Sequence, residues 1–520
     1  MSSDQAPGVF PPHAHPWDRR AAFTLLAILA IALASLPWLV HGWYEAGDET
    51  NDAAIYVASA RALLAGEGYS YLGEPFTVRP PGMSVLLAAI FAWRGADWHA
   101  VNLAVSLSGV ACIAFLYLHA QRRIGTLLAA LVALAVWFST PFQTLCNQAM
   151  SDVPGAALLF ACLALERWAA ARPSARREIV LGLAIGLSTY VRSVTILLVP
   201  AIVVARAWSA WSGRGSIARP GDARGWIRFG LVRLAPVALA AFAAKLPWDV
   251  RCATNHPTPP VDQNFLYSYS TAMWHVDGGD PSSPRRELMS IVERIPERAE
   301  TVLSLLGARM GPSSGEAATI AVGILLLALA AITAWRRRES AELFAAAFLG
   351  VLLIYFGFRD RLALPLWLVV LPAAAEGLVL LLRIRAGPLA ACAVVAVALA
   401  ALPFLDFRPR QGWDRLEAQH AFYERYAAEV AAAVPPEQRI ASQVGWHLSV
   451  YLDRPVWSLF FAARRAGGPE GALQAIERHR IDAVALSPRI ASDRSIGPWL
   501  AARMEPVRSS ADAMVLRVRR

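Results

Sequence analysis

Apolar segments long enough to cross a lipid bilayer recur along this 520-residue chain as far as residue 404. A transmembrane helix needs about 20 predominantly apolar residues. Eleven segments approach or reach that length, and they cover residues 21–40, 100–119, 124–140, 153–171, 178–191, 193–208, 230–247, 318–335, 342–358, 362–382 and 386–404. The sequence therefore predicts a polytopic all-α membrane protein with about 11 transmembrane helices.

Two regions leave the number of helices open. Residues 178–191 and 193–208 are short and adjacent, so they could form one bent element. Residues 81–93 are apolar but too short to span, and we expect a re-entrant or interfacial helix there.

Arginines gather in every second connection between the apolar segments. Cytoplasmic loops of membrane proteins carry an excess of Lys and Arg, so this alternation places the N-terminus inside. The five basic connections contain Arg122–Arg123, Arg167 to Arg177, Arg214 to Arg228, Arg336 to Arg338, and Arg383 with Arg385. The net charge of +10 thus indicates orientation in a membrane and not nucleic-acid binding. We expect a bacterial inner-membrane protein with a disordered cytoplasmic tail at 1–20 and periplasmic loops at 42–99 and 248–317.

The composition changes after the last apolar segment. Charged residues make up 26% of residues 405–520 but 14% of the residues before them. Arg439–Val444 and Ile481–Ser487 are short β-like runs, and Pro469–Arg478 between them has helical spacing. The sequence therefore predicts a transmembrane domain over 21–404 followed by a small periplasmic α/β domain over 405–520.

Carboxylates stand at the expected outer ends of two helices. Asp48 and Glu49 follow the first segment, and Asp152 precedes the segment that begins at residue 153. Asp48, Asp52 and Tyr56 are spaced by four residues, so they share one face if this stretch is helical. Simpler interpretations stay open, because Asp152 could serve only as a helix N-terminal charge and Asp48-Glu49 as part of a solvated loop.

Three arginines lie on the same side. Arg79 precedes two prolines, Arg251 follows Pro247-Trp248, and Arg361 precedes a segment that begins with Leu364-Pro365. A guanidinium offers a planar fork of donors that matches a phosphate group. The alternatives are unspecific anchoring to lipid headgroups and side chains that extend toward the membrane surface.

The cysteines and histidines show no spacing typical of a metal site. Two carboxylates at one mouth leave a divalent cation open, but no cofactor is required. Cys146 and Cys252 are both expected outside, so a disulfide between them also stays open.

Carboxylates and arginines on one side of a multi-span protein suit glycosyl transfer from a polyprenyl phosphate. Cations would stabilise the charge that develops on the departing phosphate, and a carboxylate would activate the acceptor hydroxyl. A base on the face opposite the leaving group would invert the anomeric centre. A transporter or flippase of a lipid-linked sugar is the alternative, although repeats and mid-span charges would then be expected. A structural assembly protein would leave the clustering unexplained.

The motifs resemble those of the GT-C superfamily of membrane glycosyltransferases, over about residues 20–405. The similarity is greatest to the branch of the protein O-mannosyltransferases and the bacterial aminoarabinose transferase of lipid A. Lysine is usual in that branch where Arg79 stands here. The resemblance rests on Asp48-Glu49 … Tyr56 … Gly73-Glu74-Pro75 … Arg79-Pro80-Pro81, Met150-Ser151-Asp152-Val153-Pro154, Pro247-Trp248 … Arg251, and Arg361 … Leu364-Pro365.

The resemblance implies a role for each matched residue. Asp48 would be the catalytic base or an acid that orients the acceptor, and Asp152 a second acid near the acceptor. We expect Asp48, Asp152, Arg79 and Arg251 to converge in one cavity open to the periplasm and to the lipid. The donor would be a sugar on undecaprenyl or a related polyprenyl phosphate, and the acceptor a lipid A core, a polysaccharide or a protein. The implied substrate-binding residues are Arg79 and Arg251 at the lipid phosphate, Glu49 and Tyr56 in the pocket wall, and Arg361.

Overall fold

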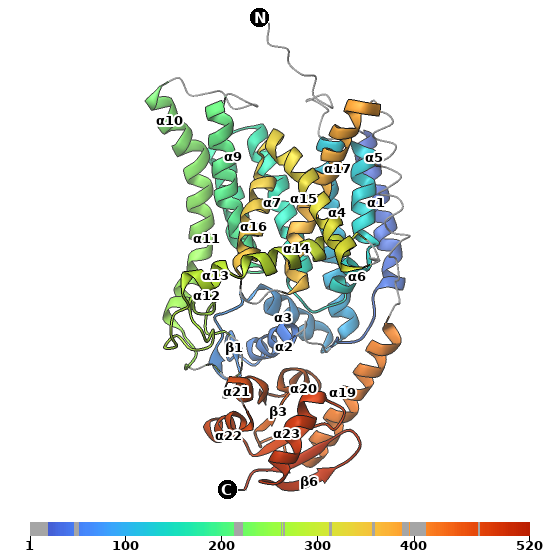
Figure 1. Ribbon diagram of the computed structural model, residues 1–520, viewed down its shortest axis with the longest axis vertical. Helices are drawn as coiled ribbons and strands as arrows, with labels where there is room; N and C mark the ends of the chain where they lie inside the picture. Colours follow the sequence, from blue (N-terminus) through green and yellow to red (C-terminus); the bar gives the residue numbers. More distant parts are fainter. Residues whose placement is uncertain are drawn as a thin grey trace, which may run out of the picture.

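A bundle of long helices stands on a smaller domain with a β-sheet (Figure 1). This computed structural model describes residues 19–45, 51–212, 222–259, 261, 263, 266–310, 315–355, 359–386, 395, 412–465 and 468–519. Helix α1 (Arg19–Leu39) begins at the end of the bundle that lies farthest from the C-terminal domain (Figure 1). Residues 1–18 of the predicted N-terminal tail lie outside the described part of the chain.

Within the described residues, seven helical segments are long and apolar enough to span a membrane, so this is a multi-span membrane protein. Helices α5 (Thr126–Trp137) and α6 (Thr140–Cys146) add an eighth segment if this pair, bent by 62°, counts as one span. The seven are α1, α4 (Trp98–Ile124), α7 (Asp152–Ala171), Ser193–Ser212 with α9 (Leu198–Ser212), Arg224–Thr254 with α10 (Ala223–Phe229) and α11 (Ala235–Thr254), α15 (Glu316–Arg337), and Asp360–Leu382 with α17 (Leu364–Ala386).

The expected number of about 11 spans differs from this count for physical reasons. The segment at 178–191 forms α8 (Ala175–Ser188) with 14 residues, and that at 342–358 forms α16 (Ser340–Ile354) with 15. Both are shorter than the roughly 20 residues of a straight span. Residues 189–192 separate α8 from the next helical segment. The last expected segment, 386–404, lies outside the described residues except for 386 and 395.

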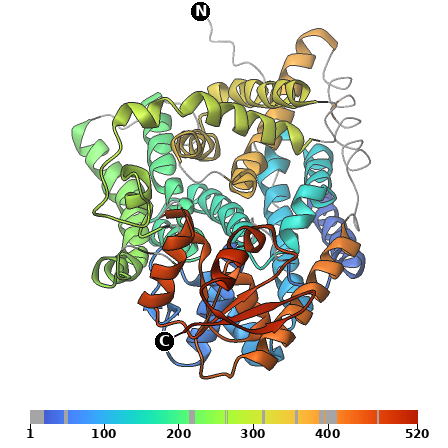
Figure 2. The same cartoon turned by 60° about the horizontal axis from the view of Figure 1, so that its bottom comes forward.

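The C-terminal domain contains a mixed sheet of five strands in the part that is described. The strand order is β4-β3-β5-β7-β6, with β3 parallel to both of its neighbours and β7 antiparallel to both of its own. Figure 2 turns this domain toward the reader. The strands are β3 (Ile440–Ser442), β4 (Val456–Ser458), β5 (Ala483–Leu486), β6 (Glu505–Ser509) and β7 (Met514–Arg517), and the helices are α19 (Trp413–Ala433), α20 (Gly445–Leu452), α21 (Phe460–Arg465), α22 (Pro469–Arg478) and α23 (Ala491–Ala501).

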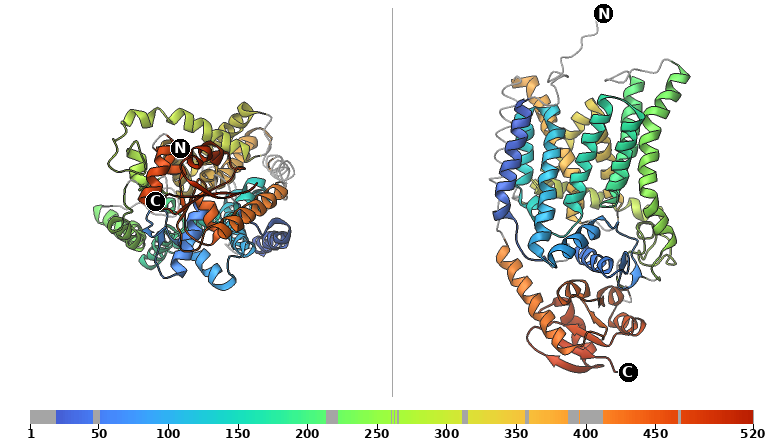
Figure 3. Two further views of the ribbon diagram at one scale, coloured as in Figure 1. Left: turned by 90° about the horizontal axis from the view of Figure 1, so that it is seen from below. Right: turned by 180° about the vertical axis from the view of Figure 1, so that it is seen from behind.

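The first loop lies between the bundle and this domain (Figure 3, right). It consists of α2 (Asn51–Leu64), a hairpin of β1 (Ser70–Tyr71) and β2 (Glu74–Pro75), and α3 (Gly82–Arg94), the short apolar helix expected at 81–93. The guanidinium of Arg61 on α2 donates to the carbonyls of Ser449 (2.8 Å) and Val450 (3.0 Å) near the end of α20. It also pairs with Asp453 at 2.6 Å. Cations favour the C-terminal end of a helix, so this contact fastens α2 to the C-terminal domain.

The second long loop crosses the same end of the bundle (Figure 3, left). Its described helices are α12 (Tyr269–Trp274), α13 (Leu288–Val292) and α14 (Ile295–Ala308). Helix α14 packs closely on α15, because a Cβ atom at Gly323 would lie 2.0 Å from the carbonyl oxygen of Leu303.

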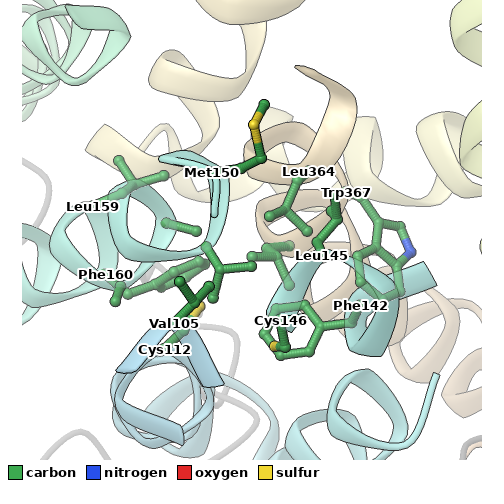
Figure 4. Packing of buried hydrophobic residues seen from close by; sticks show 14 of the residues in the cluster. Val105, Cys112, Phe142, Leu145, Cys146, Met150, Leu159, Phe160, Leu364 and Trp367 are labelled. Carbon is green, nitrogen blue, oxygen red and sulfur yellow. The ribbon is translucent and has the colours of Figure 1, made fainter. Parts of the chain in front are cut away.

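Small residues set the contact between α8 and α11. Gly182 and Gly186 are four residues apart on α8, and a Cβ atom on them would lie 2.3 Å and 2.4 Å from backbone oxygens of α11. Such small-xxx-small pairs let helix backbones approach closely in membranes. Elsewhere the bundle packs large apolar side chains (Figure 4), among them Val105 and Cys112 of α4, Phe142, Leu145 and Cys146 of α6, Met150, Leu159 and Phe160, and Leu364 and Trp367 of α17.

The disulfide left open by the sequence is not formed. Cys146 is buried and free, and Cys252 is free with its thiol 3.3 Å from the carbonyl oxygen of Thr77. The structure thus settles the open question against a disulfide between these two residues.

Buried ion pairs join four helices near the turn that follows α4. Arg123 of α4 pairs with Glu342 of α16, and its Nε lies 3.2 Å from a carboxylate oxygen of Glu376 on α17. Arg337 of α15 pairs with the other oxygen of Glu376 at 2.6 Å. A buried charge that loses its partner is costly, so these side chains depend on one another.

We expect Arg123→Met to lower the unfolding free energy by roughly 3–5 kcal/mol, because it leaves Glu342 buried without this cation. Arg122→Met is the matched control, since Arg122 is exposed on the same turn. Thermal unfolding of both purified variants in the same detergent measures the difference. Equal melting temperatures for the two variants would contradict a stabilising role for the ion pairs.

Candidate active site

Two aspartates from different helices face a common set of arginines. Asp52 lies in the first turn of α2, and Asp152 is the first residue of α7 and fully buried. The N-terminal end of a helix favours a carboxylate, which partly offsets the cost of this burial.

Arg361, just before α17, connects the two aspartates. Its Nη1 donates to Asp152 Oδ2 at 3.1 Å, and its Nη2 donates to Asp52. Arg79 pairs with the other oxygen of Asp52, and Arg192 Nη1 lies 2.8 Å from Asp152 Oδ1. The charges therefore form one chain of contacts, Arg79–Asp52–Arg361–Asp152–Arg192, here called the arginine–aspartate cluster.

The backbone around Arg79 is fixed from several directions. Two prolines follow it and restrict the chain, and the Tyr69 hydroxyl donates to the Arg79 carbonyl at 2.9 Å. The Gly82 amide donates to the Tyr190 carbonyl at 2.7 Å, where a Cβ atom would lie 2.6 Å from that same oxygen. Only glycine permits this approach, so Arg79 is held at a rigid corner.

A second glycine gives Arg192 access to Asp152. A Cβ atom at Gly155, one turn into α7, would lie 2.8 Å from Cδ of Arg192. The aliphatic part of Arg192 therefore passes over Gly155 on its way to the carboxylate. A larger residue at 155 would push the guanidinium away.

The pKa values agree with a strongly ionised site. Burial acts to raise the pKa of Asp52, but the charges of Arg79 and Arg361 outweigh it and hold the pKa well below its usual range. Burial and the neighbouring Asp52 raise the pKa of Tyr56 to about 12. Tyr56 is therefore neutral, and its hydroxyl lies 3.1 Å from Ser151 Oγ, beside Asp152.

Arg309 adds a further cation at the end of α14. Its Nη2 donates to the Asp360 carbonyl at 2.8 Å, and its guanidinium lies 5.6 Å from the ring centroid of Trp367. Its Nε and Nη1 are buried, and no described residue accepts a hydrogen bond from them. Burial lowers the pKa of Arg309 to about 10, although Asp360 and Asp152 oppose this.

The described charges of this region do not balance. Four arginines (Arg79, Arg192, Arg309 and Arg361) lie with three aspartates (Asp52, Asp152 and, beside Arg309, Asp360), so the described residues carry one more positive than negative charge. Burying an excess charge is costly. The arrangement is therefore suited to binding an anion.

Of the site residues expected from the sequence, four lie in or beside the arginine–aspartate cluster, one lies near it, and two are outside the described residues. Asp152, Tyr56, Arg79 and Arg361 come together in or beside the arginine–aspartate cluster. Arg251 stands one contact away, with its Nη2 donating to the Tyr69 carbonyl at 2.6 Å while Tyr69 holds the Arg79 carbonyl. Asp48 and Glu49 lie outside the described residues, so their roles stay predictions.

Three site residues received no role from the sequence. Asp52 was visible through its spacing of four from both Asp48 and Tyr56, and Arg192 through its place in an apolar region. Arg309 follows no motif, and only its burial in the folded protein reveals it.

The described residues of the site do not suit the divalent cation left open by the sequence, and Asp48 and Glu49 are not among them. Among the described residues no group of three His, Cys, Asp or Glu side chains is placed to hold a metal. Asp52 and Asp152 are each held by two arginines, whose charges would oppose a cation.

Comparison with known proteins agrees with this architecture. The sequence profile of the dolichyl-phosphate-mannose-protein mannosyltransferase family matches residues 78–248. ArnT from Cupriavidus metallidurans, solved with bound undecaprenyl phosphate, superposes with a TM-score of 0.58 at 15% identity, covering 97% of this chain and 98% of its own. The chain has the GT-C fold.

Two further solved structures are similar to this chain. The apo form of the same ArnT gives a TM-score of 0.59 at 16% identity, covering 95% of this chain and 98% of that one. The oligosaccharyltransferase AglB from Archaeoglobus fulgidus, solved with an inhibitory peptide and a dolichol-phosphate, gives 0.55 at 15% identity, covering 89% and 69%. No curated protein matches the sequence. The expected GT-C resemblance and fold class are thereby confirmed.

We expect inorganic phosphate to raise the melting temperature of the purified protein above its value in chloride at equal ionic strength, because the anion would neutralise the excess charge. Arg309→Met should abolish most of this shift. Arg285→Met is the control, because Arg285 is an exposed arginine of the same loop. A full phosphate shift in Arg309→Met would show that Arg309 takes no part in anion binding.

Proposed function

We propose that this protein is a glycosyltransferase that moves one sugar from a polyprenyl phosphate to an envelope acceptor on the periplasmic side, with inversion. The arginine–aspartate cluster, with its excess of positive charge at one end of a multi-span bundle, carries this proposal. The acceptor is a glycolipid such as the lipid A core, a polysaccharide or a protein. The sugar is not specified by the contacts described.

The charge of the site suits the course of this reaction. A polyprenyl phosphate sugar is a phosphodiester with one negative charge, and the departing polyprenyl phosphate has nearly two. The guanidinium groups of Arg79 and Arg361 can receive the second negative charge as it develops on this phosphate. Cations and hydrogen-bond donors accelerate a reaction when they bind the charge that develops in the transition state more strongly than they bind the ground state.

Asp52 is suited to the role of base once the donor is bound. A phosphate that binds Arg79 and Arg361 competes with Asp52 for the same guanidinium groups. The carboxylate then loses the charges that hold its pKa low, so it becomes a better proton acceptor.

The transfer step follows from this arrangement. The acceptor oxygen forms a bond to the anomeric carbon while the bond from that carbon to the phosphate oxygen breaks. The proton of the acceptor hydroxyl passes to Asp52, and the arginines receive the phosphate. Asp48, the base implied by resemblance, stays the second candidate for this proton.

The periplasmic location is supported by the basic connections. Arg122, Arg172 and Arg337 lie at the ends of α4, α7 and α15, and Asp152 lies at the opposite end of α7 from Arg172. Positive loops face the cytoplasm in most membrane proteins, so the site faces the other compartment.

The flippase alternative has less support. Charges are buried within the bundle, for example Glu178 with Arg206 at 2.6 Å and with Arg233 at 3.1 Å. They pair with each other and tie neighbouring helices together. A transporter would need such groups to meet its substrate or to exchange partners as the helices move.

We expect Asp52→Asn to lower the rate of sugar transfer by about 10²–10⁴-fold, the usual contribution of a general base. Undecaprenyl phosphate should still bind at least as tightly, because the competing carboxylate charge is gone. Transfer is measured with a panel of radiolabelled polyprenyl phosphate sugars and an envelope fraction, and binding by native mass spectrometry. Asp48→Asn tests the other candidate, and Asp249→Asn, at a half-exposed aspartate, is the control. Wild-type transfer by Asp52→Asn would remove Asp52 as the base.

Arg79→Gln should weaken undecaprenyl phosphate binding by roughly tenfold or more, since a hydrogen-bonded charge contributes about 1.5–3 kcal/mol. Arg79→Lys should retain most of the affinity, because lysine is usual at this position in the resembling branch. The same native mass spectrometry measures both variants. Equal binding by wild type and Arg79→Gln would exclude a phosphate contact.

A further inference from the structure

A cleft between the two domains lies apart from the arginine–aspartate cluster. It encloses about 610 Å³ of empty space, including the part that is open to solvent. The β1–β2 hairpin, the C-terminal domain, and Pro257, Val261, Gln263 and Leu266 of the second long loop contribute to its walls. Its lining includes Tyr71, Glu74, Phe76, Trp457, Arg478 and His479. We call it the interdomain cleft.

Backbone contacts hold the walls of this cleft together. The Gln263 side chain accepts from the Ser458 amide at 2.6 Å and donates to the Ser458 carbonyl at 3.3 Å. Strand β4 is the outermost strand of the sheet on that side, and these two hydrogen bonds satisfy the amide and the carbonyl of Ser458 on its outer edge. The long second loop is therefore fixed to the C-terminal domain beside Trp457.

Trp457 lies on the more exposed face of β4, because the side chains of this strand alternate between its two faces. Val456 and Ser458 are buried, and Trp457 between them is half-buried, as expected for a strand whose successive side chains face opposite ways. The guanidinium of Arg439 lies 5.7 Å from its ring centroid, and the ring of His479 lies 6.4 Å away. These contacts fix the orientation of a large aromatic surface in the cleft.

The lining has the chemistry of a carbohydrate site. The half-buried ring of Trp457 offers an apolar surface against which the C–H face of a sugar can stack, and the charged and polar side chains of Glu74, Arg478 and His479 line the same cleft. Ligand sites are mostly apolar with a few polar groups that set orientation. A lipid chain would gain nothing from these charged groups.

The interdomain cleft is joined to the arginine–aspartate cluster by one short segment. Phe76, Thr77 and Val78 line the cleft, and the next residue is Arg79. The Arg79 guanidinium lies 5.9 Å from the ring centroid of Phe76. Arg79 is two residues after Thr77, and two residues of extended chain span about 7 Å. A sugar bound in the cleft would thus lie within a few sugar units of the arginine–aspartate cluster.

We propose that the interdomain cleft binds a saccharide unit of the acceptor, at a distance from the hydroxyl that receives the new sugar. This inference rests on the proposed function and deepens it, because it makes the acceptor a glycan or the sugar headgroup of a glycolipid. The cleft then selects the acceptor and holds it while the cluster acts on the donor.

The test measures saccharide binding without any donor. Methyl glycosides of glucose, mannose, galactose and N-acetylglucosamine are added to the full-length protein in lipid nanodiscs, since maltoside detergents would compete. Saturation-transfer NMR should detect at least one of them. Trp457→Ala should reduce that signal about tenfold or more, and Trp457→Phe should retain part of it.

Trp499→Ala is the matched control. Trp499 packs on the same apolar cluster of the C-terminal domain as Trp457 and also carries an arginine, Arg503, at 3.9 Å, but it does not line the cleft. It should bind the glycosides like wild type. No signal from any of the four glycosides, or equal signals in wild type and Trp457→Ala, would overturn the proposal.

The outcome is separable from that of the transferase assay. Glycoside binding that depends on Trp457, together with unchanged transfer in both Asp52→Asn and Asp48→Asn, would place the failure in the catalytic assignment. Loss of transfer in Asp52→Asn together with no glycoside binding would show instead that the assignment of the cleft is at fault.

Discussion

A single guanidinium, that of Arg361, bridges two carboxylates that come from different helices. Asp152 is fully buried, so its charge is tolerable only while Arg361 and Arg192 stay in place. The positions of α2, α7 and α17 are therefore coupled through ionic contacts as well as through apolar packing. The ionic contacts of the arginine–aspartate cluster therefore also hold this end of the bundle together.

The proposed chemistry follows from competition for these arginines. Without substrate, carboxylates occupy the donors that a phosphate would use, and the remaining cations are imperfectly matched. A bound phosphate relieves the mismatch and releases Asp52 in the same event. Donor binding and activation of the base are thereby a single step, which would limit reaction of the acceptor to the occupied enzyme.

Hydropathy and the arginine pattern were sufficient to predict the fold class, and the β-like runs near residues 440 and 483 did form strands. Hydropathy could not show how short α8 and α16 are, since it does not register where a helix bends or ends. Among site residues, Arg79 and Arg361 were recognisable because prolines or apolar segments frame them. Arg309 was not, because its neighbours in sequence carry no pattern and its partners are distant in the chain.

Helix α2 carries Asp52 at one end and Arg61, the anchor to the C-terminal domain, near the other. Arg61 is nine positions after Asp52, which corresponds to about 14 Å along a helix. A tilt of the extramembrane domain would move α2 as a rigid helix and would therefore displace the Asp52 carboxylate. Removal of that domain would therefore loosen Asp52, and a shortened chain should not be expected to keep the alignment of this carboxylate.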